Sequence, residues 1–300
     1  MFRISKRFSL FLVLIAASLL VAWRPLSETM ALAWQNDMYT HILLILPVCL
    51  FMLFAERRLL LDASSWSFRG GAAVIFGAVT ISCCAWIWSA SLTADILLTL
   101  KIFALVIAWI GCFLLCFGAR LTRKLIFPLL FLFGLVPLPR VALDWSISLL
   151  QIGSAWSTHA FLAAFGVPVF QRGVEIAVPG LVVQVAQECS SIRSSSMLIV
   201  TTLVMAEVLL VSFWRKALVV SLAVPLSVLK NGLRIFVLVM LGTRVDPGYL
   251  HGWLHHQGGF IYFGLALGGI FALIWLLRKR EHAVLVSRPG QVEDALTPAD

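Results

Sequence analysis

Apolar runs long enough to cross a membrane recur along the whole chain. A transmembrane helix needs about 20 consecutive, mostly apolar residues, and eight such runs can be read in these 300 residues. They cover approximately residues 8–23, 39–55, 71–90, 97–118, 125–139, 195–213, 217–242 and 259–277. The composition agrees, because 61% of the residues are hydrophobic and 12% are charged, whereas roughly 25% are charged in a soluble domain. We therefore predict an all-α polytopic membrane protein with about eight transmembrane helices.

The basic residues predict how these helices are oriented. They form clusters between the apolar runs: Arg3, Lys6 and Arg7; Arg57, Arg58 and Arg69; Arg120, Arg123 and Lys124; Arg215 and Lys216; Arg278, Lys279 and Arg280. Basic residues beside a span are kept in the cytoplasm during insertion, and every cluster falls there if the N-terminus is cytoplasmic. We expect a bacterial cytoplasmic (inner) membrane protein with both termini inside, and no nucleic-acid binding. A single transmembrane domain would cover residues 1–280, before a disordered cytoplasmic tail at 281–300.

Residues 140–193 differ from the other segments that this topology places outside. The stretch "LDWSISLLQIGSAWSTHAFLAAFG" has apolar residues at helical spacing and polar residues on its remaining face. It predicts an extracytoplasmic amphipathic helix at the membrane interface. The stretch "VPVFQRGVEIAVPGLVVQVAQEC" alternates apolar and polar residues and predicts one or two short strands that lead to Cys189. We expect the catalytic core to lie within residues 140–277.

Three polar features stand at the predicted outer ends of the last three spans. Cys189 precedes the sixth span, Arg234 lies inside the seventh, and a group of histidines leads into the eighth, namely His251, His255 and His256. The other five cysteines lie inside apolar runs, where a thiol packs as a small hydrophobe. We expect neither a disulfide framework nor a metal site, and the topology brings cysteine, arginine and histidine to one side of the membrane.

These residue types together indicate acyl transfer through a thioester. A thiolate nucleophile needs a pKa below the free value of roughly 8.5, and both Arg193 and the start of the sixth helix favour the charged form of Cys189. A histidine can take up and return the proton. Arg234 can stabilise the oxyanion of the tetrahedral intermediate, with a role as proton donor left open.

An arginine inside a membrane span is costly and therefore a functional candidate. Lys230 precedes Arg234 by four residues, so both face the same side of a helix; Asn231 lies between them as a supporting residue. The alternative for both cations is that they snorkel to the interface or bridge helices by hydrogen bonds. The sequence assigns no role to Lys101, Lys230 or Glu188.

Four stretches between about residues 145 and 263 carry a family resemblance. They are "LLQIGSAWSTHAFLAAFGVPVFQRGVEI", "VAQECSSIRSSSML", "VPLSVLKNGLRI" and "HHQGGFIYF". Together they resemble the exosortase/archaeosortase family of membrane-embedded cysteine transpeptidases. That family's pattern is a Cys-Ser-Gly-(Ile/Leu)-Arg box, an Asn-x-x-Arg step in the next helix and a His-x-x-x-Gly start to the last. This chain departs from the pattern at Ser191, which stands where the box has glycine.

The resemblance implies Cys189 as nucleophile, Arg234 as second catalytic residue and His255, four residues before Gly259, as the third. Because two histidines are adjacent, His256 is the second choice. The implied substrates are exported proteins with a PEP-CTERM-like C-terminal signal: a short Pro-containing motif, a transmembrane helix and a basic tail. The enzyme would cleave near the motif at the outer face of the membrane and transfer the new C-terminus to an unknown acceptor. No cofactor or metal is implied.

Other readings of these residues remain open. His251 and His255 have a spacing compatible with metal ligands, but glycines interrupt the stretch and no HExxH pattern occurs. The serines after Cys189 allow a serine peptidase, although serine is also common at helix starts. The non-enzyme alternative is a transporter or an assembly factor for surface polysaccharide export, with Lys101, Lys230 and Arg234 lining a path.

Overall fold

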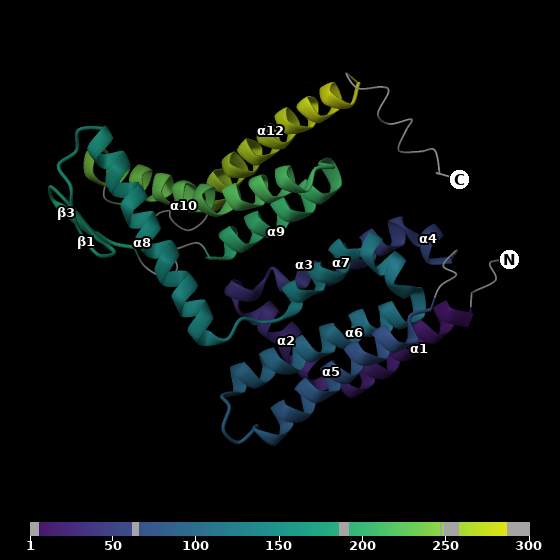
Figure 1. The fold of residues 1–300 in the computed structure, drawn as a ribbon. Coiled ribbons are helices and arrows are strands. Elements are labelled where there is room, and N and C mark those ends of the chain that lie inside the picture. The colour runs from purple at the N-terminus through teal and green to yellow at the C-terminus, as the bar shows by residue number, and fades with distance from the viewer. Residues whose placement is uncertain (1–5, 62–65, 186–191, 247, 249–257, 287–300) are drawn as a thin grey trace. The chain divides into compact units, whose positions relative to one another are not determined.

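A computed structural model describes residues 6–61, 66–185, 192–246, 248 and 258–286. These residues are mostly helical, with one small antiparallel sheet (Figure 1), as predicted for an all-α membrane protein. The contacts group the chain into two compact units, Met1–Asp144 and Trp145–Asp300. The single transmembrane domain over residues 1–280 stays a prediction.

The first unit consists of helices connected by short turns. The elements are α1 (Lys6–Val21), α2 (Trp23–Gln35), η1 (Asp37–Tyr39), α3 (Ile42–Ala55), α4 (Arg57–Leu61), α5 (Phe68–Ile87), α6 (Ala94–Lys124), α7 (Ile126–Phe131) and η2 (Leu132–Leu135). Helix α6 packs along α5 and α1. A small residue allows the close approach of α5 and α6, because a Cβ on Gly71 would lie 2.4 Å from the Cβ of Leu115.

Among the described residues, six helices are long and apolar enough to cross a membrane, and the number rises to eight if two bent helix pairs each count as one span. One pair is α1 with α2, bent by 75°, and the other joins Ile126–Leu135 to Arg140–Ala164 with a bend of 97°. The second bend falls at Pro137 and Pro139, which lack the backbone N–H that would continue a helix. The predicted span at 125–139 therefore ends early, at Leu135.

The second unit contains the sheet and four long helices. Its elements are α8 (Arg140–Ala164), which begins in the first unit, β1 (Phe170–Arg172), β2 (Glu175–Val178), β3 (Leu181–Gln184), α9 (Ile192–Leu209), α10 (Phe213–Arg244) and α12 (Gly259–Val286). The sequence predicted one or two strands in this region, and its described residues form three. The two hairpin turns contain Gly173 (φ 61°) and Gly180 (φ 82°), whose positive φ angles suit glycine.

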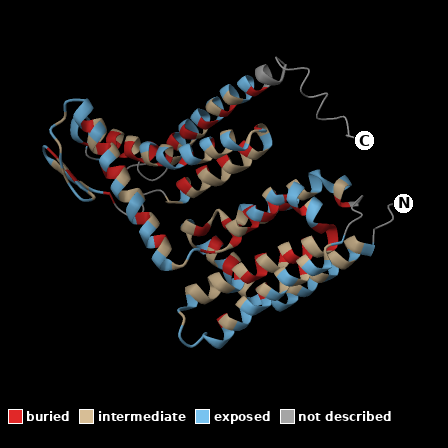
Figure 2. Cartoon of the chain, in the orientation of Figure 1, coloured by how far each residue is buried: buried red, intermediate tan, exposed pale blue. Residues whose placement is uncertain are grey.

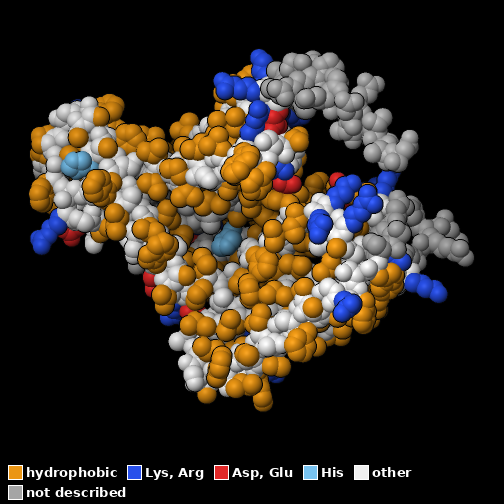
Figure 3. Space-filling model, viewed as in Figure 1, with side chains coloured by type: hydrophobic (Ala, Val, Ile, Leu, Met, Phe, Trp, Pro, Cys, Tyr) orange, Lys and Arg blue, Asp and Glu red, His pale blue; other side chains and the backbone are white. Residues whose placement is uncertain are grey.

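Helix α8 has the expected helical form, but its polar side faces the protein. Ser154 and Thr158 have no exposed surface, whereas Trp145, Ile152 and Trp156 are among its exposed residues. Buried and exposed residues likewise alternate along α9, α10 and α12 (Figure 2). Hydrophobic side chains cover most of the surface seen in Figure 3. An apolar exterior around partly polar helix contacts is the arrangement that a lipid environment requires.

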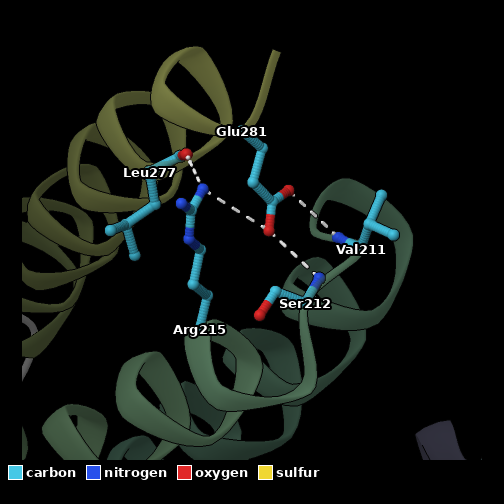
Figure 4. Close-up of polar contacts among 5 residues, drawn as sticks. All are labelled: Val211, Ser212, Arg215, Leu277 and Glu281. Atoms are coloured by element: carbon cyan, nitrogen blue, oxygen red, sulfur yellow. Dashed lines mark hydrogen bonds and ion pairs between the residues drawn. The ribbon is translucent and has the colours of Figure 1, made fainter. Parts of the chain in front are cut away.

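Helix α12 continues to Val286, six residues into the segment predicted as a disordered cytoplasmic tail at 281–300. Glu281 is 8% exposed and its carboxylate accepts hydrogen bonds from the backbone N–H groups of Val211 (3.1 Å) and Ser212 (3.0 Å) (Figure 4). Arg215 lies 3.6 Å from the same carboxylate and donates to the carbonyl oxygen of Leu277 at 2.8 Å. These contacts tie the α9–α10 turn to α12. Residues 287–300 lie outside the described part of the chain.

We expect Glu281→Ala to lower the free energy of unfolding by about 2–3 kcal/mol, because two partly buried N–H groups lose a charged acceptor. The measurement is thermal unfolding of the purified protein in detergent. Glu207→Ala is the matched control, since the 2.7 Å ion pair between Glu207 and Lys216 is partly exposed and such pairs contribute about 0–1 kcal/mol. Equal destabilisation by both substitutions would contradict the anchoring role of Glu281.

Candidate active site

Polar side chains form a continuous seam between α8, α9 and α10. The Ser227 hydroxyl of α10 donates to the Ser195 hydroxyl of α9 at 2.9 Å, and the Lys230 ammonium donates to the Ser194 hydroxyl. On the other side of α10, the Asn231 amide donates to the Ser154 hydroxyl of α8 at 2.9 Å. We call the set the polar seam: Ser154, Thr158, Ser194, Ser195, Ser227, Lys230 and Asn231.

The polar seam is buried within otherwise apolar helices. Ser227 and Asn231 are each 1% exposed and Lys230 is 6% exposed. Lipid tails offer no hydrogen-bond partner, so polar groups at this depth must be satisfied by the protein. The seam therefore fixes how α8 and α9 align along α10. It also shows that Lys230 bridges helices, which was one of the two alternatives for this residue.

A glycine allows α8 and α10 to approach closely within the seam. The Thr158 hydroxyl donates to the carbonyl oxygen of Gly232 at 3.2 Å and to that of Ser154 at 2.8 Å. A Cβ on Gly232 would lie 2.4 Å from the hydroxyl oxygen of Ser157 and 3.1 Å from the backbone nitrogen of Thr158. The backbone contact therefore depends on the absence of a side chain at position 232.

Arg234 continues the same side of α10 one helical turn beyond Lys230. Its side chain is half-buried, and its Nη1 atom lies 4.0 Å from the position that a Cβ on Gly259 would occupy. The guanidinium thus reaches the first residue of α12. Gly259 is also the glycine of the predicted His-x-x-x-Gly motif, so the end of that motif lies beside Arg234.

The structure brings together the described flanks of all three predicted motifs. Ser194, held by Lys230, follows Cys189 by five residues, and Gly259 follows His255 by four. Cys189, His251, His255 and His256 themselves lie outside the described residues, as does Glu188. Of the predicted supporting residues, Arg193 is exposed in the first turn of α9 and Asn231 belongs to the polar seam.

A cavity of about 350 Å³ lies beside the polar seam. Lys230 contributes the cationic part of its wall, and apolar or aromatic side chains from α8, α10 and α12 form the rest, among them Phe161, Leu229, Leu233, Tyr262 and Leu265. Lys101, which the transporter reading placed on the same path as Lys230, is an exposed residue of α6 in the first unit. Within the described ranges, no group of three or more His, Cys, Asp or Glu side chains is arranged to hold a metal ion.

A family model described as "Transmembrane exosortase (Exosortase_EpsH)" matches residues 34–272, well over half of the sequence. The chain belongs to the transmembrane exosortase family. The match extends upstream of the motif region into α3, α5 and α6, which the sequence resembled only in their hydrophobicity. Neither a curated protein nor a solved structure matches this exosortase. The exosortase family is generally one of cysteine transpeptidases, whose substrates are exported proteins.

Sequence reasoning missed the part that the serines play in this exosortase. It treated Ser194 and Ser195 as a polar start of the sixth span, but both contact α10. A signal was present, because Ser227, Lys230 and Asn231 repeat at helical spacing within an apolar run. The sequence did not show which serines on other helices lie opposite them.

We expect Gly232→Ala to destabilise the protein by about 1–3 kcal/mol, because the new methyl group overlaps Ser157. Gly264→Ala in α12 is the matched control, since a Cβ there meets nothing within 4 Å and alanine favours a helix. Thermal unfolding in detergent measures both. Adding Ser157→Gly should restore part of the loss in Gly232→Ala. A stability unchanged by Gly232→Ala would show that α8 and α10 are not in close contact.

Proposed function

We propose that this exosortase is a membrane-embedded cysteine peptidase and transpeptidase that cleaves the C-terminal sorting signals of exported proteins. The observation that carries the proposal is the arrangement around α10. Ser194, close in sequence to Cys189, bonds to Lys230, and Gly259, close in sequence to His255, lies beside Arg234. The described flanks of the cysteine and histidine motifs thus lie near the helix that carries Arg234, which supports the proposal.

The proposed substrate carries a Pro-containing motif, a transmembrane helix and a basic tail at its C-terminus. The reaction takes place at the outer (periplasmic) face of the bacterial inner membrane, with both termini of the enzyme in the cytoplasm. The cluster Arg215–Lys216 supports this orientation, because it lies at the start of α10, next to the end of α9, whereas the polar seam involves the start of α9. The substrate helix would remain in the bilayer beside the second unit while its motif reaches the site.

The proposed reaction has two acyl-transfer steps. The Cys189 thiolate attacks the carbonyl carbon of the scissile peptide bond, and the Arg234 guanidinium donates hydrogen bonds to the oxyanion that forms. The C–N bond then breaks, and the departing amine takes a proton from His255, with His256 as the second choice. The resulting thioester is attacked by water or by the acceptor nucleophile, which gives a proton to the histidine and regenerates the thiolate. Arg234 suits the oxyanion role because a guanidinium stays protonated.

We expect Cys189→Ala to abolish processing of a co-expressed substrate, because no nucleophile remains. Arg234→Lys should lower the processing rate by a factor of about 100–1,000, since a displaced single ammonium replaces the fork of donors at the oxyanion. Immunoblots of substrate length over time measure both effects. Arg244→Lys is the matched control, because Arg244 is the exposed last residue of the same helix.

Normal processing in Cys189→Ala would overturn the cysteine mechanism. Such a result, combined with loss of function in Lys101→Ala, would favour the alternative of a transporter or an assembly factor for polysaccharide export. The amount of each variant in the membrane fraction must match that of the unmodified protein, so that failed insertion is not counted as lost activity.

A further inference from the structure

Strand β3 forms one edge of the small sheet, and its outer side chains are exposed. The strand order is β1-β2-β3, so within the described residues the sheet ends at β3 (Figure 1). Val182 is 69% exposed and Gln184 is also exposed. The opposite side of the sheet packs through Ile176 into a core formed with α8 and α10. The sheet is thus held firmly by the protein, and no described strand pairs with the outer edge of β3.

The hydrogen-bond pattern shows which backbone groups β3 presents at that edge. The N–H of Val185 donates to the carbonyl oxygen of Val174 at 3.0 Å, so these residues form a hydrogen-bonded pair. In an antiparallel ladder such pairs alternate with pairs whose N–H and C=O groups point outward. Counting back in the observed register, Val183 faces β2. Val182 and Gln184 therefore turn their backbone N–H and C=O groups away from the sheet.

The two edges of the sheet are not equivalent. Proteins usually protect an open edge with lysine, proline or a bulge, yet the sequence of β3 is "LVVQ", with no charge and no proline. By the same alternation, β1 directs outward only Gln171 of its three residues, and the Gln171 side chain donates to the carbonyl oxygen of Gly173 at 2.9 Å. Arg172 adds a charge to that edge. β3 is therefore the edge suited to accept another strand.

We propose that the β3 edge binds an extended segment of the substrate polypeptide as a fourth strand. Val182 and Gln184 present donors and acceptors that repeat about every 7 Å, and an extended peptide backbone presents the complementary groups at the same repeat. A lipid or a sugar has no such repeat. The inference rests on the proposed function for the identity of the peptide. Gln184 precedes Cys189 by five residues in the chain, so this edge is close in sequence to the proposed nucleophile.

The test uses a fluorescent peptide that spans the Pro-containing motif of an exported protein from the same host. Its affinity is measured by anisotropy on the Cys189→Ala protein, where turnover cannot interfere. Val182→Pro removes one outward N–H without removing a ladder bond to β2, and we expect it to raise Kd about 3–10-fold, the loss of roughly one hydrogen bond. Gln171→Pro, the same change on the β1 edge, should leave Kd unchanged.

A second measurement uses the Cys189→Ala protein with Val182 unchanged and modifies the peptide instead. Methylation of one peptide nitrogen at a time should weaken binding only at every second position, because alternate N–H groups of a paired strand face the sheet. Uniform losses, no losses, or equal effects of Val182→Pro and Gln171→Pro would overturn the proposal. A dimer that Val182→Pro dissociates, without the alternating pattern, would instead assign the edge to a second copy of this chain. An alternating pattern together with normal processing by Cys189→Ala would retain the strand site and reject the cysteine mechanism.

Discussion

Buried polar side chains on α10 need partners on neighbouring helices, because the surrounding lipid provides none. Ser227 and Lys230 find them in α9, and Asn231 finds its partner in α8. Apolar packing alone tolerates sliding of one helix along another, whereas a set of hydrogen bonds on two sides of α10 is satisfied in one alignment. Arg234 occupies the next turn of the same helix, so the alignment that satisfies the seam also sets the position of the proposed oxyanion donor.

A second set of polar contacts lies at the other ends of the same helices. The seam is at the start of α9 and Arg234 is beside the start of α12, whereas Glu281 joins the end of α12 to the turn that follows α9. The seam therefore joins the start of α9 to the middle of α10, and the Glu281 contacts join the end of α12 to the turn between α9 and α10. Between them the contacts are apolar, with Leu198, Ala223 and Ile270 in the core. Rigid support of this kind is what a site needs to hold a nucleophile and an oxyanion donor in register.

The sequence predicted the helices well because hydropathy reports directly on which segments cross a membrane. It predicted less about contacts between them. To predict three strands, one would have to recognise that Gly173 and Gly180 form two separate hairpin turns. The role of Glu281 was missed because its partners, two backbone N–H groups, have no sequence signature. The family pattern pointed to Arg234 and Asn231, and the structure added the serines that bond to Asn231 and to Lys230 on the same helix.

The central claim is that Cys189 forms a thioester with the substrate, and trapping that adduct tests it most directly. Purified exosortase is mixed with substrate, quenched in acid during turnover, digested and examined by mass spectrometry. The account predicts a peptide containing Cys189 whose mass is increased by the acyl part of the substrate, with hydroxylamine removing the increase. An acyl group on the oxygen of Ser190 or Ser194, or product formation by Cys189→Ala without any adduct, would contradict it.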